Sequence, residues 1–101
     1  MLHQMEEKDS DTALKGSDIY SILEHQGFKC NLTGTHLTPE TASIDHIIPL
    51  SKGGSHTKGN AQIILSSVNQ AKGTMTQEEF IAMCRQVVEW ANWPASLNSG
   101  S

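Results

Sequence analysis

The sequence has few of the residues that stabilise small secreted domains or cross membranes. It contains two cysteines, Cys30 and Cys84, too few for a four-cysteine structural zinc site or a disulfide framework. No apolar run approaches the roughly 20 residues that a membrane-spanning helix needs. Residues 1–17 include no apolar stretch typical of a secretory signal. We therefore expect an intracellular, cytoplasmic domain with free thiols and no membrane contact.

Basic residues are scarce as well, because seven lysines and arginines face eleven carboxylates and the formal net charge is −4. This acidic excess weakens the case for tight nonspecific binding to nucleic acid. The charge is unevenly distributed, however. Residues 1–18 hold five carboxylates and two lysines, whereas residues 45–73 hold one carboxylate and three lysines. The middle of the chain is therefore compatible with a nucleic-acid substrate.

Composition and hydrophobic spacing divide the 101 residues into one domain with two tails. We expect residues 1–16 to be a flexible acidic tail, residues 17–93 to fold, and residues 94–101 to be a second flexible tail. Ser17 is placed to cap a first helix and Gly27 to end it.

The middle of the domain predicts a hairpin and the rest predicts two helices. Residues 42–47 and 61–65 have the composition of short strands, and a glycine-rich loop separates them. Ser66 or Ser67 can cap a short helix that follows. The last helix begins with a capping box at residues 76–79, and we interpret its apolar stripe as core. The fold class is α+β, with a two-stranded antiparallel hairpin between an N-terminal helix and a longer C-terminal helix.

Asp45 and His46 lie at the end of the first predicted strand, where Pro49 soon forces a turn. Aspartate is a hard oxygen ligand that suits Mg²⁺ or Mn²⁺. Histidine is the side chain best suited to take a proton near neutral pH. Together they suggest a metal beside a general base, as in hydrolytic enzymes. Asn60 and Asn69 follow His46 by 14 and 23 residues.

Over roughly residues 28–85 this pattern resembles the HNH, or ββα-metal (His-Me finger), endonucleases, most closely small phage-type members. The resemblance implies that His46 is the general base and that Asp45 and Asn69 hold one divalent metal. It implies that Asn60 supports catalysis by bonding loop backbone and holding the strand of His46. The metal is expected to be Mg²⁺ or Mn²⁺, with Zn²⁺ or Ni²⁺ as alternatives.

Four further residues are candidates for substrate contact. Lys72 follows Asn69 by one helical turn and could meet a phosphate of the DNA. The loop residues Lys52, Lys58 and His56 could also touch the DNA backbone, although solvent exposure alone would account for them.

The sequence therefore predicts a metal-dependent endonuclease that nicks or cleaves DNA, in the host cytoplasm if phage-encoded. The resemblance also suggests phage packaging proteins, such as a terminase, as partners. The alternative is a non-catalytic DNA-binding or packaging-accessory module on the same scaffold. A small helical interaction domain with a chance motif is a third reading, which requires several coincident spacings.

Overall fold

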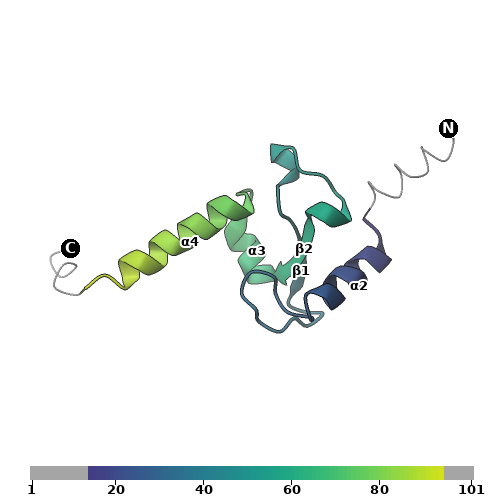
Figure 1. Ribbon diagram of the computed structural model, residues 1–101, viewed down its shortest axis with the longest axis horizontal. Helices are drawn as coiled ribbons and strands as arrows, with labels where there is room; N and C mark the ends of the chain where they lie inside the picture. The colour runs from purple at the N-terminus through teal and green to yellow at the C-terminus, as the bar shows by residue number, and fades with distance from the viewer. Residues whose placement is uncertain (1–13, 95–101) are drawn as a thin grey trace.

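The computed structural model describes residues 14–94, and Figure 1 shows the order of the elements. Most of the two predicted tails lies outside the described residues. The helix α2 spans Gly16–His25, and the strands β1 and β2 span Ala42–His46 and Ala61–Leu65. The helices α3 and α4 span Ser66–Lys72 and Gln77–Ala91. Two short 3-10 turns, η1 at Leu50–Lys52 and η2 at Lys58–Asn60, lie in the connection between the strands.

The strands β1 and β2 form the antiparallel hairpin that the sequence predicts, so the α+β class is confirmed. Asp45 faces Gln62 and His46 faces Ala61 across the ladder. This register places Asp45 and Gln62 on the same face of the sheet, because directly opposed residues share a face. The helix α3 follows β2 without a linker and contacts both strands, which completes a ββα unit.

The helix α2 packs beside β2 and is fastened to it at its C-terminal end. Gln26 donates from Nε2 to the carbonyl of Ile63 at 2.9 Å and accepts from the N–H of Ile63 at 2.9 Å. Gly27 adopts a positive φ of 67° and ends the helix as predicted. The predicted cap at Ser17 is wrong by two positions. Lys15 occupies the cap position, and its backbone N–H donates to the Asp18 carboxylate at 3.0 Å.

A small apolar core lies between α2, the hairpin and the turn before β1. Cys30 is buried in this core, and its sulfur accepts the N–H of Leu65 at 3.3 Å. Leu65 and Val68 pack against the same core. The buried members of the core are Ile22, Cys30, Leu37, Ala61, Ile63 and Ile64.

The helix α3 begins at Ser66, at least one residue earlier than it would if Ser66 or Ser67 were its N-cap. Leu65 occupies the cap position and makes no side-chain capping bond, so the prediction that Ser66 or Ser67 caps this helix is wrong. The direct passage from β2 into α3 explains the difference, because Leu65 must stay in the strand to meet Ala42. Gly73 ends the helix with a positive φ of 55°.

The helix α4 begins as predicted but does not bury its apolar stripe. Thr76 accepts the N–H of Glu79 at 3.1 Å, and the Glu79 carboxylate accepts the N–H of Thr76 at 2.9 Å, which completes the capping box. Phe80 is the one buried residue of α4. Val87 and Val88 are exposed, so the interpretation of the whole stripe as core is wrong.

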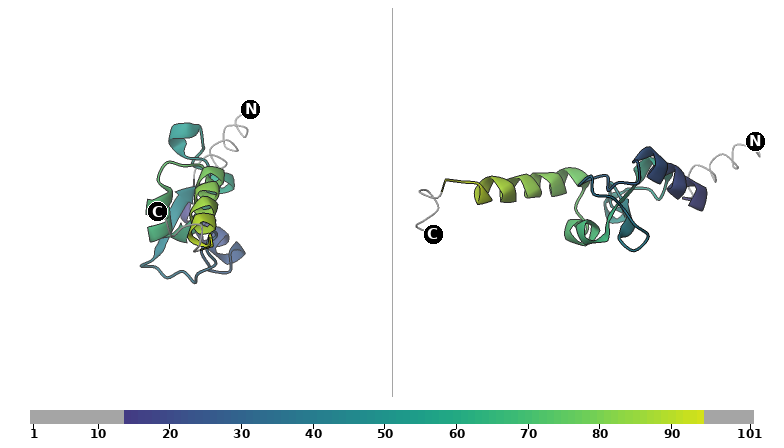
Figure 2. Two further views of the ribbon diagram at one scale, coloured as in Figure 1. Left: turned by 90° about the vertical axis from the view of Figure 1, so that its left-hand side faces the viewer. Right: turned by 90° about the horizontal axis from the view of Figure 1, so that it is seen from below.

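The reason is visible in Figures 1 and 2, where α4 projects away from the hairpin after its first turn. Helical spacing shows that one face is apolar, but it does not show that another element covers that face. Among the described residues, no helix is both long enough and apolar enough to cross a membrane.

Candidate active site

A cavity of about 350 Å³ opens where β1 ends, beside η1 and the last turn of α3. Asp45, His46 and Asn69 all line it, although they are up to 24 residues apart in the chain. The hairpin supplies the first two residues and α3 supplies the third. The complete lining consists of Ile44, Asp45, His46, Pro49, Leu50, Ser51, Asn69, Gly73 and Thr74.

The Asp45 carboxylate is 5% exposed and lies in a fixed network of donors. Lys72 Nζ lies 3.1 Å from Oδ1 and 3.0 Å from Oδ2. Gln62 donates from Nε2 to Oδ2 at 2.9 Å. A buried carboxylate requires such partners, because an unpaired charge in the interior costs several kcal/mol. Oδ1 still has lone-pair capacity, since an ionised carboxylate can accept about four hydrogen bonds, two at each oxygen.

Lys72 lies inside the protein, not on the surface where a phosphate contact would place it. Its side chain is 0% exposed, and its ammonium also donates to the carbonyl of His46 at 3.0 Å. The helix α3 directs this side chain back under the end of β1. In this arrangement Lys72 supports Asp45 and the backbone of His46, and its ammonium does not reach solvent.

Asn69 is half-buried on α3 and is held by its amide nitrogen. Nδ2 donates to Ser43 Oγ at 2.7 Å and to the carbonyl of Ile44 at 3.3 Å. In this orientation Oδ1 makes no hydrogen bond to the described residues and is available as an oxygen donor beside the cavity.

His46 is half-buried at the end of β1 and pairs with a residue of the glycine-rich loop. Its Nε2 lies 2.8 Å from Nδ1 of His56, and the ring centroids are 5.0 Å apart with a 58° angle between the planes. The sequence places His56 in the loop and suggests a DNA contact. The structure directs it toward His46.

Asn60 joins the two sides of the loop that connects the strands. Its Oδ1 accepts the N–H of Ile48 at 2.9 Å. Its Nδ2 donates to the carbonyl of Ile48 at 2.9 Å and to that of Ser55 at 2.7 Å. Gly54 lies against the same point, and a Cβ there would overlap the carbonyl of Ile48. Side-chain bonds and close backbone approach together fix the loop beside His46.

The two loop lysines, Lys52 and Lys58, lie at the surface, and each contacts one side chain. Lys52 Nζ lies 2.7 Å from Oε1 of Glu79, and both side chains are substantially exposed. The hydrogen bond from Lys52 lowers the pKa of Glu79, and the bond to the N–H of Thr76 adds to this effect. Lys58 Nζ donates to Ser21 Oγ at 3.0 Å. Exposed bonds of this kind are weak enough to exchange for a phosphate.

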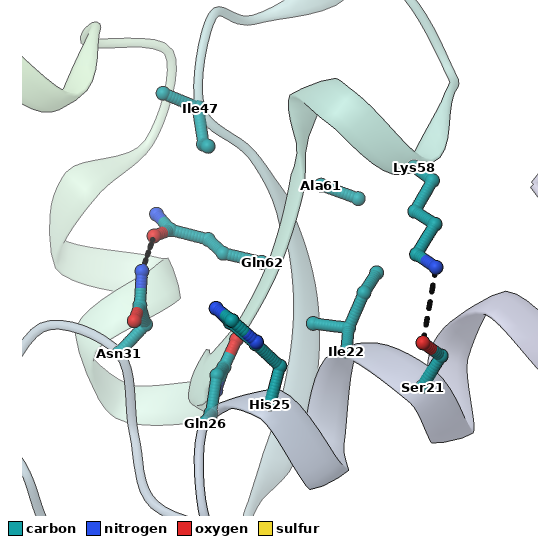
Figure 3. A pocket seen from close by; sticks show the side chains of 9 residues that line it. All are labelled: Ser21, Ile22, His25, Gln26, Asn31, Ile47, Lys58, Ala61 and Gln62. Carbon is teal, nitrogen blue, oxygen red and sulfur yellow. Dashed lines mark hydrogen bonds between the residues drawn. The ribbon is translucent and has the colours of Figure 1, made fainter.

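A second cavity of about 350 Å³ lies between α2 and the start of β2 (Figure 3). Gln62 lines it and accepts the amide of Asn31 at 2.8 Å, as the dashed line in Figure 3 marks. The Nε2 of Gln62 donates a hydrogen bond to Asp45, which lines the first cavity. Gln62 therefore connects the lining of the second cavity to the Asp45 carboxylate of the first.

The donor set fits a small divalent cation. Asp45 and Asn69 offer a carboxylate and an amide oxygen to one cavity, and hard oxygen donors are the ligands that Mg²⁺ and Mn²⁺ prefer. Residues 14–94 contain no group of three or more histidine, cysteine, aspartate or glutamate side chains that could hold a metal. A cation here would thus have two protein ligands and leave its other positions to water or phosphate oxygens.

A two-stranded hairpin followed by a helix, with Asp-His at the strand end and an amide on the helix, defines a protein of the ββα class. Residues 27–75 match the family described as HNH endonuclease. The chain therefore contains a domain, spanning slightly less than half of its residues, that is similar to the HNH endonuclease family. Its members usually are endonucleases that act on DNA with a divalent metal, which indicates a nuclease. No curated protein matches the chain.

Sequence reasoning missed three contacts that shape the site. Gln62 donates a hydrogen bond to Asp45, Ser43 accepts one from Asn69, and His56 shares one with His46. The pairing of Asp45 with Gln62 follows from the hairpin register, which the strand lengths alone leave open. No local sequence signal indicates the other two contacts, because each joins segments at least 10 residues apart.

Proposed function

We propose that this protein is a metal-dependent endonuclease that hydrolyses phosphodiester bonds in DNA, with His46 as general base. The observation that carries the proposal is the convergence of His46, Asp45 and Asn69 on one cavity. An imidazole beside two oxygen donors can supply a general base and a cation site, both of which promote hydrolysis of a phosphodiester. We place this activity in the cytoplasm, where DNA would be available.

In this proposal His46 takes a proton from the attacking water, and Asp45 and Asn69 hold the cation. When bound, the cation neutralises charge at the scissile phosphate and on the leaving oxygen. The amide of Asn69 is restrained by Ser43, and the carboxylate of Asp45 by Gln62. Both ligands are therefore oriented before the cation arrives, which limits the entropy lost on binding.

The buried ammonium of Lys72 gives the proposed site a particular electrostatic character. It lies within 3.1 Å of both oxygens of Asp45 and neutralises most of the charge that would attract a cation. We therefore expect weak metal binding by the protein alone. Affinity should rise when the DNA phosphate supplies further oxygen ligands and negative charge.

The alternative function is a non-catalytic DNA-binding or packaging-accessory module, with a terminase among its partners. The observation in its favour is again the pair of Asp45 and Lys72, since a purely structural ion pair would have this geometry. The alternative predicts DNA or protein binding without metal-dependent cleavage. It gives no reason for Asn69 to share the cavity with His46.

A nicking assay on supercoiled plasmid tests the proposal. Wild-type protein should nick the plasmid with Mg²⁺ or Mn²⁺ and leave it intact with a chelator. His46→Ala should lose cutting while its circular dichroism spectrum is unchanged. His36→Ala is the matched control, because His36 is exposed and lines neither cavity. Undiminished cutting by His46→Ala would refute the assignment of the base, and inactive wild type would favour the alternative.

A further inference from the structure

The pairing of His46 with His56 constrains where the protons of both rings lie. At 2.8 Å between Nε2 of His46 and Nδ1 of His56, one hydrogen must lie between the two nitrogens. A neutral imidazole carries a single N–H, so the nitrogen that enters this bond determines which nitrogen of His46 can take a proton. The partner of the ring therefore decides which atom acts as base.

Several contacts hold the loop around His56 in the conformation in which this hydrogen bond forms. Asn60 Nδ2 donates a hydrogen bond of 2.7 Å to the carbonyl of Ser55, the residue before His56. Ser55 and Thr57, on either side of His56, share a hydrogen bond of 2.8 Å between their hydroxyls. Gly54 allows the loop to approach Ile48 more closely than any side chain would. Three independent restraints thus fix the backbone that carries His56.

We propose that His56 is a positioning residue whose Nδ1 accepts the Nε2–H of His46. This bond leaves Nδ1 of His46 without a proton and makes it the atom that takes a proton from water. The inference rests on the proposed function, because it specifies the tautomer and orientation of the same general base. It assigns His56 a role through His46 and no contact with substrate.

Hydrogen-bonded partners of this kind are common around functional histidines, where they set the tautomer and the ring angle. The contact between the two rings, at 5.0 Å between centroids, also restricts rotation of His46 about its side-chain bonds. Removing the partner frees the ring to adopt other rotamers and the other tautomer. The loss should appear in the catalytic rate more than in substrate binding, because His46 is proposed to act on the water.

Isosteric substitutions separate this role from a general structural one. Asparagine places its amide close to the position of a histidine Nδ1, whereas glutamine extends to the position of Nε2. We expect His56→Ala to lower kcat by about 10- to 100-fold with little change in KM. His56→Asn should recover much of the loss, and His56→Gln should recover little.

Nitrogen NMR of the histidine rings in the full chain tests the tautomer without any cleavage. With the rings neutral, wild type should show His46 protonated at Nε2, and His56→Ala should show a mixture of tautomers. His46 protonated at Nδ1 in wild type would overturn the proposal. It would also be overturned if His56→Asn behaved like His56→Ala, or if Zn²⁺ alone shifted both rings together as a metal-binding pair. Wild type that cuts no DNA yet shows the expected tautomer would refute the nuclease and leave the pairing established.

Discussion

The ammonium of Lys72 and the carboxylate of Asp45 form a buried ion pair beneath the cavity, with Nζ 3.0 Å from Oδ2. Both side chains are almost inaccessible to solvent, at 0% and 5% exposure. A charge in such a place is tolerated only with its counter-charge, so the two residues depend on each other. The pair fixes the carboxylate proposed to hold the metal, and it lowers that carboxylate's attraction for a cation.

Lys72→Met should therefore destabilise the fold. Methionine keeps much of the side-chain volume but leaves the Asp45 carboxylate buried with Gln62 as its remaining bonded partner. Breaking a buried pair in this way costs about 3–5 kcal/mol, measured as the free energy of unfolding in urea. Lys29→Met is the control, because Lys29 is exposed. A change below about 1 kcal/mol, the size typical of an exposed pair, would mean that the pair is not buried in solution.

The same substitution should strengthen metal binding. Without the neighbouring ammonium, the Asp45 carboxylate attracts a cation more strongly, so Mn²⁺ should raise the melting temperature of Lys72→Met more than that of wild type. Equal shifts for the two proteins would show that the cation does not bind at Asp45.

Gln62→Leu should weaken the support of Asp45 from the other side. The change removes the donor to Oδ2 and leaves the amide of Asn31 without its acceptor. Loss of a buried hydrogen-bond partner costs about 1–3 kcal/mol in the free energy of unfolding. Gln70→Leu, on the exposed face of α3, should change it by less than about 0.5 kcal/mol. Equal effects of the two substitutions would contradict the network described around Asp45.

Gly54→Ala should displace the loop that carries His56. The added methyl group would overlap the carbonyl of Ile48 and come within 2.8 Å of Nδ2 of Asn60. We expect loss of DNA cleavage and altered NMR signals from His46. Gly59→Ala is a close control in the same loop, because a Cβ there meets nothing within 4 Å. Full activity of Gly54→Ala would show that the loop geometry does not matter for cleavage.

Glu79 should make the start of α4 sensitive to acid. The hydrogen bond from Lys52, and then the bond to the N–H of Thr76, lower the pKa of Glu79. A carboxyl group whose pKa is lower in the folded state stabilises that state above the ordinary pKa, and this stabilisation is lost as the pH falls through the lowered value. Helicity measured by circular dichroism should therefore fall with acid less steeply in Glu79→Gln than in wild type.

Glu78→Gln serves as the neighbouring control for that titration, because Glu78 is exposed on the same turn. Both titrations are best made at low salt, since screening weakens exposed pairs. Identical acid titrations of wild type and Glu79→Gln would show that the capping box contributes nothing to the helix in solution.

The parts of the fold that local sequence signals specify were predictable. The strand Ala61–Leu65 has the predicted bounds, and the capping box at Thr76 and Glu79 forms as expected. These features depend on β-branched composition and on residues three apart along the chain. The stop at Gly73 depends likewise on the backbone freedom of a single residue.

Features that depend on packing between distant segments were not predictable. The sequence places Lys72 one turn after Asn69 but does not show that its side chain turns inward to Asp45. The stripe on α4 is apolar, yet whether another element covers it is not encoded in its spacing. In the candidate site, the residue types and offsets indicated Asp45, His46 and Asn69. The contacts of Gln62 with Asp45 and of His56 with His46 could be identified only in the folded structure.

The most direct test of the central claim is chemical rescue of plasmid nicking in the presence of Mn²⁺. His46→Ala should nick far more slowly than wild type, and added imidazole should restore part of the rate by replacing the missing side chain in the cavity. His46→Ala that nicks at the wild-type rate without imidazole would contradict the account.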